Sequence, residues 1–228
     1  MRLYFISDLH ANLEAVQAVA SQMGAGPVFC LGDIVGYGAN PDEVVSWVKK
    51  RGVVCVLGNH DEAVLTGEVS WFNRHAAQAA LWTRRVLSQE SRAFLGALPA
   101  TRIAEVEGLK ILMAHGSPSD PLREYVDPST HSDLFEFYLT KHKVDAVALG
   151  HTHVPYVWAS KVGAVFNPGS VGQPRTGDPR ASFATAEISG HQLSVDLHLT
   201  PYDIDTAAEK MQQAGLPPIL WQRLYRGI

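Results

Sequence analysis

Short apolar runs alternate with segments of helical periodicity through the first 150 residues. Each run is four to six residues long and is followed by a polar, mostly glycine-containing segment, which is typical of a buried strand. The predicted strands cover residues 3–6, 28–31, 53–57, 109–114 and 146–149. The predicted helices cover residues 13–23, 41–51, 61–98 and 131–142. Strands that alternate with helices in this way predict an α/β fold.

Consecutive strands dominate the rest of the chain. Residues 103–106 and 109–114 flank Glu107-Gly108 and predict a hairpin. The later predictions are strands at 156–159, 162–166, 182–188 and 193–199, a turn at Ser189-Gly190, a helix at 203–214 and an apolar tail through Trp221. This order predicts an antiparallel-rich second part.

We expect one domain over residues 1–228, because no repeat, low-complexity tract or linker divides the chain. The helical segment at about 68–98 is either a cap over a site or part of the core. Phe72 is expected in the core, and Trp71 fits either position.

Composition narrows the class of protein. Hydrophobic residues make up 46% of the 228 residues and charged residues 18%, which excludes disorder and allows a substantial core. The net charge of −4 argues against nonspecific nucleic-acid binding. Cys30 and Cys55 lie in apolar runs and are expected to be buried free thiols in a reducing compartment. Without a membrane-length apolar stretch or a signal-peptide pattern, a cytoplasmic protein is expected.

Five predicted strands end in a polar segment that carries oxygen or imidazole donors. These donors are Asp8 and His10, Asp33, Asn59 and His60, His115, and His151 and His153. Taken singly, each is better explained as a turn residue or a core histidine. Ligands of open α/β sheets bind at the carboxyl ends of the strands, so the combination favours a metal site.

The number of donors points to two metal ions. Seven candidate ligands exceed the three or four that one catalytic ion uses, whereas two ions about 3.5–4 Å apart can share a carboxylate. Nitrogen and oxygen donors without thiolate suit Mn, Fe, Co, Ni or Zn, and histidine disfavours a pure Mg or Ca site. Mn is the favoured ion.

The motifs resemble those of the calcineurin-like metallophosphoesterase superfamily. They are Asp8-Leu9-His10, Gly32-Asp33, Gly58-Asn59-His60-Asp61, His115 and Gly150-His151-Thr152-His153. Residues 32–41 and 167–174 further resemble its small single-domain prokaryotic phosphoesterases. The resemblance implies two facing mixed β-sheets flanked by helices, a four-layer αββα sandwich with a dimetal site at one end.

The resemblance also implies roles for individual residues. One ion would take Asp8, His10 and His153, the other Asn59, His115 and His151, with Asp33 bridging them. His60 would stay free of metal and give a proton or hydrogen bond to the leaving-group oxygen. The implied nucleophile is a hydroxide that bridges the two ions.

The chain departs from relatives that act on phosphoproteins at Gly36 and Tyr37, where those relatives carry Asp and Arg. The missing Asp would have oriented the catalytic histidine, a role that Asp61 could take unless it only begins a helix. Tyr37, Arg123 and Arg175 are the candidate substrate contacts, although each arginine could be an ordinary surface residue. Residues 167–170 form either a plain turn or an anion-binding nest.

The expected function is metal-dependent hydrolysis of a small phosphate ester. A phosphodiester is favoured, because a dianionic monoester needs more cations than these motifs offer. The alternatives are a phosphomonoesterase or a dinucleoside polyphosphate hydrolase, then a nuclease, and then a non-catalytic scaffold such as a retromer subunit. The acidic balance disfavours nucleic acid as partner, and the intact motifs disfavour the scaffold. A membrane partner is not expected, and a homo-oligomer is left open.

Overall fold

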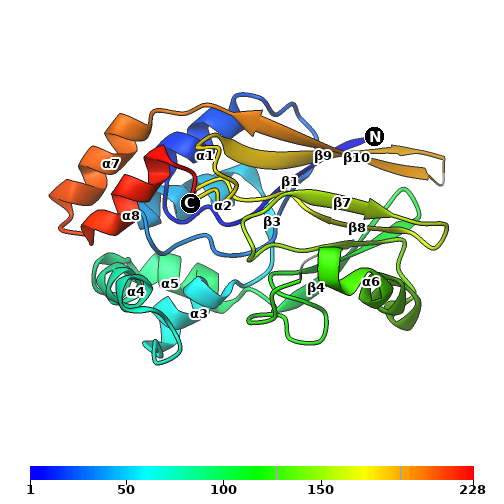
Figure 1. The fold of residues 1–228 in the computed structure, drawn as a ribbon, viewed down its shortest axis with the longest axis horizontal. Helices are drawn as coiled ribbons and strands as arrows, with labels where there is room; N and C mark the ends of the chain where they lie inside the picture. Colours follow the sequence, from blue (N-terminus) through cyan, green and yellow to red (C-terminus); the bar gives the residue numbers. More distant parts are fainter. Residues whose placement is uncertain (127, 191) are drawn as a thin grey trace.

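Two five-stranded β-sheets pack face to face in the computed structural model, which describes residues 1–126, 128–190 and 192–228 (Figure 1). The first sheet has the order β10-β9-β1-β2-β3. Its strands are β1 (Arg2–Ile6), β2 (Val28–Cys30), β3 (Val54–Cys55), β9 (Ala181–Ser189) and β10 (Gln192–Thr200). The second sheet has the order β4-β5-β6-β8-β7. Its strands are β4 (Thr101–Val106), β5 (Leu109–Ala114), β6 (Ala146–Ala148), β7 (Tyr156–Ala159) and β8 (Ala164–Asn167).

The five strands that precede the candidate ligands are all parallel to a neighbour. β1, β2 and β3 run parallel in the first sheet, and β5 runs parallel to β6 in the second. Antiparallel strands flank both sets, because β9 pairs with β1, β4 with β5 and β7 with β8. Parallel strands bring their carboxyl ends to one edge of a sheet, which places the candidate ligands of each sheet together.

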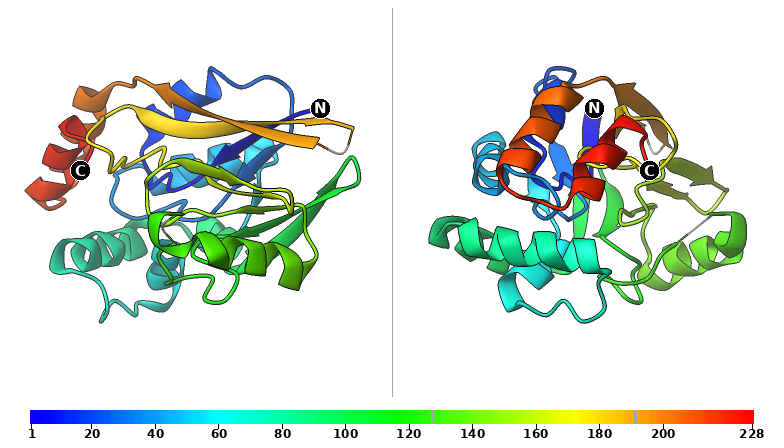
Figure 2. Two further views of the ribbon diagram at one scale, coloured as in Figure 1. Left: turned by 45° about the vertical axis from the view of Figure 1, so that its right-hand side comes forward. Right: turned by 60° about the vertical axis from the view of Figure 1, so that its left-hand side comes forward.

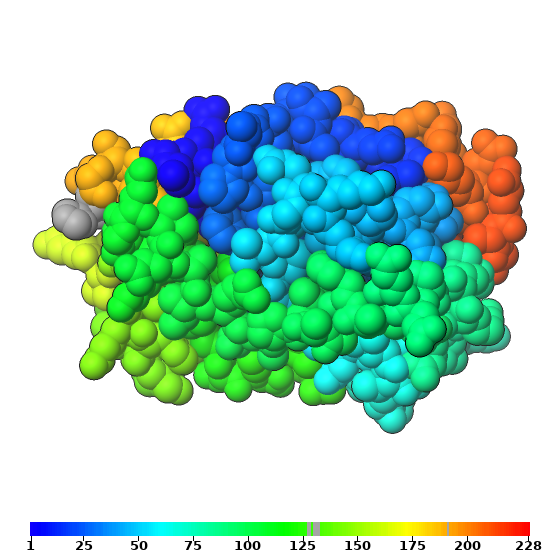
Figure 3. Space-filling model, turned by 180° about the vertical axis from the view of Figure 1, so that it is seen from behind, coloured from blue at the N-terminus to red at the C-terminus, as the bar shows by residue number. Residues whose placement is uncertain are grey.

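Helices cover the outer faces of the sandwich. They are α1 (Leu13–Ala20), α2 (Pro41–Arg51), α3 (Asn59–Thr66), α4 (Arg74–Val86), α5 (Gln89–Gly96), α6 (Pro128–His142), α7 (Ile204–Gln213), α8 (Pro218–Gln222) and the 3₁₀ helix η1 (Arg223–Tyr225). α1 and α2 pack on the first sheet, and α6 packs on the second (Figure 2). The four-layer αββα architecture is therefore confirmed. α7 and α8 lie at one end, and the N-terminal half of the chain covers most of the face seen in Figure 3.

Burial on both faces explains why the strands are apolar runs rather than alternating ones. In β1, Leu3 and Phe5 point into the core between the sheets, whereas Tyr4 and Ile6 pack under the helices. The ring of Phe5 stacks on Phe29 at 5.0 Å and meets Phe166 of the second sheet edge-on at 4.9 Å.

The predicted long helix at 61–98 is three helices. Gly67 ends α3 with a φ of 81°, the Asn73 side chain caps α4 by accepting from two backbone N–H groups, and Ser88 caps α5. α3 begins at Asn59, so Asn59 and His60 lie on the first turn of a helix rather than in the preceding loop.

Other boundaries shift by a few residues. α1 ends at Ala20, short of the predicted 23, and α6 begins at Pro128 rather than His131. Residue 127 and the side chains of 128 and 130–132 lie outside the described part. The apolar tail forms α8 and η1, which pack with α7 and α4. Both predicted hairpins are confirmed, β4–β5 and β9–β10.

Candidate metal centre

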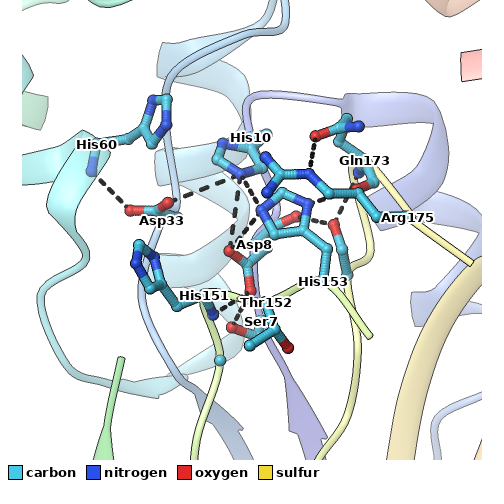
Figure 4. Close-up of polar contacts among 12 residues, drawn as sticks. Ser7, Asp8, His10, Asp33, His60, His151, Thr152, His153, Gln173 and Arg175 are labelled. Carbon is cyan, nitrogen blue, oxygen red and sulfur yellow. Dashed lines mark hydrogen bonds and ion pairs between the residues drawn. The ribbon is translucent and has the colours of Figure 1, made fainter. Parts of the chain in front are cut away.

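Three donor side chains from the first and second sheets meet at one point. The Asp8 Oδ1 atom lies 3.1 Å from His153 Nε2 and 3.7 Å from His10 Nε2. The two imidazole Nε2 atoms are 3.2 Å apart (Figure 4). All three side chains are buried. These contacts bring together the three residues expected to hold one ion.

A second group of donors lies beside the first. His115 Nε2 is 2.8 Å from Asn59 Oδ1 and 3.0 Å from His151 Nδ1. Asp33 lies between the groups, because its Oδ2 atom is 3.3 Å from His115 Nε2 and 3.7 Å from His10 Nε2. Each of the seven candidate ligands is at most 3% exposed. The structure thus brings all seven together, with Asp33 between the two groups.

Backbone strain is concentrated in the same loops. Nine non-glycine residues of the described chain have a positive φ, and five of them are candidate ligands: Asp8, His10, Asp33, His151 and His153. Such a conformation costs on the order of 1–3 kcal/mol per residue and persists only where the surroundings enforce it. Here, backbone hydrogen bonds join the loops, from Asp8 to Gly32, His10 to Asp33 and Gly150 to His115.

Backbone carbonyl groups orient the four candidate ligand histidines. One ring nitrogen of each histidine contacts a carbonyl oxygen: His10 that of Val35, His115 that of Leu31, His151 that of Arg123, and His153 that of Gln173. The other nitrogen faces the cluster. Ligating histidines in proteins are held in this way, because a hydrogen bond on one nitrogen selects the tautomer that leaves the other free to bind metal.

Asp8 provides a direct test of whether a cation fits. Its Oδ2 atom accepts from Ser7 Oγ at 2.6 Å and from His151 N at 3.1 Å. Its Oδ1 atom is buried and has no hydrogen-bond partner among the described residues. An unsatisfied buried carboxylate oxygen is costly unless a cation neutralises it. The donor set, all nitrogen and oxygen, therefore fits divalent metal ions.

The protonation states of Asp33 and His151 agree with this fit, because ligands bind metal as carboxylate and neutral imidazole. Burial would raise the pKa of Asp33, but the neighbouring histidines, His115 foremost, hold that pKa well below its usual value. Burial lowers the pKa of His151 to about 3. Burial also opposes a charge on His115, but the Asp33 carboxylate raises the pKa of His115 to about 9, so a metal ion would have to displace its proton.

His60 is held differently from these four histidines. Its ring lies between the rings of Tyr37 at 4.4 Å and Phe72 at 4.5 Å. Its Nδ1 atom is buried without a hydrogen-bond partner in the described chain, and burial lowers the pKa of His60 to about 4. Its backbone N–H donates to Asp33 Oδ1 at 2.8 Å. One ring nitrogen still comes within 4.8 Å of donor atoms of His10 and Asp33, at the edge of the cluster.

Comparison with known proteins assigns the chain to a family. Residues 1–191 match the calcineurin-like phosphoesterase superfamily domain. The chain belongs to this superfamily. It is 36% identical to MJ0912 of Methanocaldococcus jannaschii, over 97% of this chain and 96% of that protein. It is 28% identical to the phosphodiesterase YfcE of Escherichia coli, over 78% of this chain and 84% of YfcE. A metallophosphoesterase structure from Sphaerobacter thermophilus has a TM-score of 0.86 and 35% identity, with both chains fully covered.

In this superfamily member, Asp61 does not orient His60. Its buried carboxylate accepts hydrogen bonds from the backbone N–H groups of Ile34, Val35 and Gly58 at 3.0–3.3 Å. Burial raises the pKa of Asp61 to about 7, with the nearby Asp33 charge adding to the effect. The Gly58 contact is a helix-start interaction, and the other two tie α3 to the loop after Asp33. The orienting role is therefore wrong, and the helix-start alternative is seen.

Gly36 has a steric role beside His60. A Cβ atom at position 36 would lie 2.6 Å from His60 Nδ1, and the φ of Gly36 is +92°. The His60 ring thus occupies the space that a side chain at position 36 would need. A larger residue at position 36 would therefore displace the His60 ring.

A pocket of about 210 Å³ opens over the donor cluster. All three candidate substrate contacts line it: Tyr37, Arg123 and Arg175. Arg123 forms an ion pair with Glu62 at 2.9 Å, whereas Arg175 Nε donates to Gln173 Oε1 at 3.2 Å.

The segment 68–98, a possible cap over the site, covers the pocket only in part. From the segment 68–98, residues 71–73 and 76 reach the pocket, while α5 packs against α2 and α3. Trp71 is partly open to solvent. Phe72 packs against core residues, as expected, and also contacts His60.

Sequence reasoning missed several residues that hold the site together. Asn167 Nδ2 donates to the Gly150 carbonyl at 2.6 Å, and Ser170 Oγ donates to the Asp8 carbonyl at 2.9 Å. The Gly169 N–H donates a hydrogen bond to Asn167 Oδ1. Residues 167–170 therefore brace the ligand loops, and the anion-nest alternative is not supported. The turn signal was visible in the sequence, but its contacts were not.

Arg223 is a further residue that no local signal could reveal. Its guanidinium lies 4.4 Å over the Tyr37 ring, on the side chain that packs against both His10 and His60. Burial lowers the pKa of Arg223. The last residues of the chain thus support the pocket wall from behind.

No helix in the described ranges combines the length and apolar character needed to cross a bilayer.

Proposed function

We propose that this protein hydrolyses a small phosphate ester with two divalent transition-metal ions and prefers a phosphodiester to the matching monoester. One observation carries the proposal. Seven buried side chains with nitrogen and oxygen donors, Asp33 in their middle, converge beneath a pocket. A further imidazole, His60, stands beside them without a carbonyl anchor.

The residues fit two neighbouring ions. Asp8, His10 and His153 would hold one, Asn59, His115 and His151 the other, and Asp33 would serve both. Bound dications neutralise charge on phosphate oxygens and lower the pKa of water. The donor set admits Mn, Fe, Co, Ni or Zn. Of these ions, Mn is the one that we favour.

His60 would act on the leaving group. Tyr37 and Phe72 fix its ring, so a neutral imidazole can present one N–H toward the pocket with little loss of freedom. That N–H donates to the leaving-group oxygen. Because an opposite charge favours the protonated form, a bound phosphate raises the pKa of His60 and populates its imidazolium form. The imidazolium gives its proton to the leaving-group oxygen and returns to neutral imidazole.

The cations of the pocket favour the singly charged diester. A phosphate monoester dianion requires more positive charge than a diester. Arg123 is already paired with Glu62, which leaves Arg175 to contact a non-bridging phosphate oxygen. Tyr37 stands where the phosphoprotein-acting relatives carry Arg. The similarity to a protein named as a phosphodiesterase supports the same preference.

Metal reconstitution tests the proposal. Chelated protein is reloaded with Mn²⁺, Fe²⁺, Co²⁺, Ni²⁺, Zn²⁺ or Mg²⁺ and assayed with bis(4-nitrophenyl) phosphate and 4-nitrophenyl phosphate. We expect about two transition ions per chain by elemental analysis, no turnover without them, and a higher kcat/KM for the diester.

Activity that survives complete metal removal would contradict the dimetal proposal. Equal or better monoester hydrolysis would contradict the diester preference. If Arg175→Ala or Arg123→Ala then abolished monoester hydrolysis, that arginine would supply the additional positive charge that a monoester needs.

A further inference from the structure

The walls of the pocket are unusually aromatic. Four of its thirteen lining residues are Phe, Trp or Tyr, whereas these types make up 9% of the chain. They are Tyr37, Trp71, Phe72 and Tyr125. The floor, in contrast, consists of the candidate ligands Asp33, Asn59, His151 and His153. Such a pocket suits a ligand with an anionic end and a flat apolar end.

The aromatic wall begins at His60, the proposed leaving-group donor. Phe72 packs on the His60 ring at 4.5 Å, and Trp71 meets Phe72 edge-on at 4.2 Å. Trp71 therefore lies beyond Phe72 on the side of the pocket toward which a leaving group would extend. This direction rests on the proposed function, because it assumes that His60 contacts the leaving-group oxygen.

Two loops form the mouth of the pocket. The α3–α4 loop carries Trp71, and the β5–α6 loop carries Arg123 and Tyr125. The loops meet where the Arg123 guanidinium lies 5.3 Å from the centre of the Trp71 ring. Trp71 is 39% exposed and Tyr125 is 57% exposed, so both retain ring surface that no described residue covers.

Core packing alone does not explain these two side chains. Phe72 and Tyr37 contribute to the hydrophobic clusters beneath the pocket, but Trp71 and Tyr125 belong to none of the clusters found in the described chain. Tyr125 packs on His151 at 3.9 Å, which gives it a second role beside a candidate ligand. Trp71 is the cleaner probe of ligand binding.

We propose that the pocket mouth, between Trp71 and Tyr125, binds a planar aromatic ring of the leaving alcohol. Ring faces of Trp and Tyr attract another flat ring by stacking, and the nearby Arg123 adds a cation to the same wall. The shared chemistry is a flat ring attached to a phosphate. The ring can be a nucleobase or a simple aryl group. The pocket volume of about 210 Å³ has room for one such ring and a phosphate, so the other half of a diester would lie toward solvent.

Two matched pairs of phosphates test the proposal. Dissociation constants are measured by calorimetry for AMP against ribose 5-phosphate and for phenyl phosphate against methyl phosphate, using His60→Asn protein with and without Mn²⁺. Stacking on one aromatic side chain is expected to tighten the ring-bearing member about fivefold to a hundredfold. A gain for AMP alone assigns the site to nucleobases, and a gain in both pairs assigns it to flat rings in general.

Substitutions then assign the gain to the wall. In His60→Asn protein, Trp71→Leu should bring the affinity ratio toward one, and Trp71→Phe should restore part of it. Trp158→Leu is the matched control, because Trp158 packs on Phe135 beneath α6. It should leave the ratio unchanged. Circular dichroism checks that each variant is folded.

Equal affinities within both pairs, or an unchanged ratio in Trp71→Leu, would overturn the aromatic site. The two proposals fail separately. Hydrolysis without a ring preference removes only the aromatic site. A ring preference in binding, without hydrolysis of any ester by metal-loaded wild-type protein, removes only the proposed function.

Discussion

The ring of His60 is held by aromatic neighbours, whereas each candidate ligand histidine is held by a carbonyl oxygen. This difference separates two tasks within one cluster. A carbonyl bond fixes the tautomer that binds metal, whereas packing alone fixes no tautomer of His60.

Substitution of His60 should therefore separate turnover from metal binding. His60→Asn is expected to keep both ions and to lower kcat by roughly 10²–10⁴, the usual contribution of a general acid. Asp33→Asn should instead lose metal, because Asp33 contacts both donor groups. Elemental analysis and steady-state kinetics measure the two effects. Loss of an ion from His60→Asn would show that His60 is itself a ligand, and nearly unchanged turnover would contradict its role as general acid.

Gly36 should be required for the position of His60. Gly36→Ala places a Cβ atom 2.6 Å from His60 Nδ1 and should displace the His60 ring. Because the displaced ring no longer meets the leaving group correctly, kcat should fall. Gly108→Ala is the control for backbone strain, because Gly108 has a similar φ of +81° with nothing within 4 Å of its added Cβ. Both variants should lose some thermal stability, but only Gly36→Ala should lose activity. Equal activity of the two would mean that the ring adjusts without cost.

At the scale of elements, the segment after β8 links the end of the chain to the site. Gln173 is buried and makes three connections. Its Nε2 donates to the Ile228 carbonyl oxygen at 2.7 Å, its Oε1 accepts from Arg175, and its backbone oxygen contacts His153 Nδ1. The Gly177 N–H also donates to the Gly227 carbonyl at 2.8 Å. The C-terminal segment therefore braces the loop that carries Arg175.

Gln173→Leu should weaken substrate binding more than turnover. Leucine keeps the backbone contact to His153 but removes the acceptor for Arg175. We expect KM for the diester to rise roughly twofold to tenfold, the net worth of one hydrogen bond, with kcat nearly unchanged. Gln213→Leu is the matched control, because Gln213 contacts only Glu209 on the surface of α7. A fall in kcat without a change in KM would exclude a role through Arg175.

At the scale of the whole molecule, the site joins the two sheets. Asp8, His10, Asp33 and Asn59 follow strands of the first sheet, and His115, His151 and His153 follow strands of the second. The core between the sheets, with Phe5 of one against Phe166 of the other, sets the distance between these groups. Bound ions would add a second connection at the open end of the sandwich.

Metal should consequently stabilise the entire fold. A ligand at a hundred times its Kd adds about 2.7 kcal/mol to the free energy of unfolding, and 1 kcal/mol shifts the Tm of a chain this size by about 2–4 °C. Mn²⁺ should therefore raise the Tm of chelated protein by roughly 5 °C or more. Scanning calorimetry of wild type and Asp33→Asn measures this. A shift of the same size in Asp33→Asn, or none in wild type, would contradict binding at this site.

The sequence by itself determined which side chains form the cluster. Asp8 and Asp33 each follow an apolar run, and parallel strands must bring their carboxyl ends to one edge, so local pattern and chain direction were sufficient within a sheet. The order of strands and helices predicted an α/β fold with an antiparallel-rich second part, and the family resemblance implied the four layers. The long helix at 61–98 was wrong because periodicity continues across Gly67 and Ser88, where caps interrupt the backbone.

Only the tertiary structure decided what surrounds the cluster. Arg223 over Tyr37, Gln173 against Ile228 and Tyr125 on His151 join residues from different elements, and no period in the chain records such contacts. Asp61 makes the same point, because its motif places it beside His60 while its carboxylate turns to the backbone of residues 34, 35 and 58. The residues of the cluster could be predicted because they follow the ends of strands. The pocket walls could not, because their positions depend on how loops and the C-terminal helices pack.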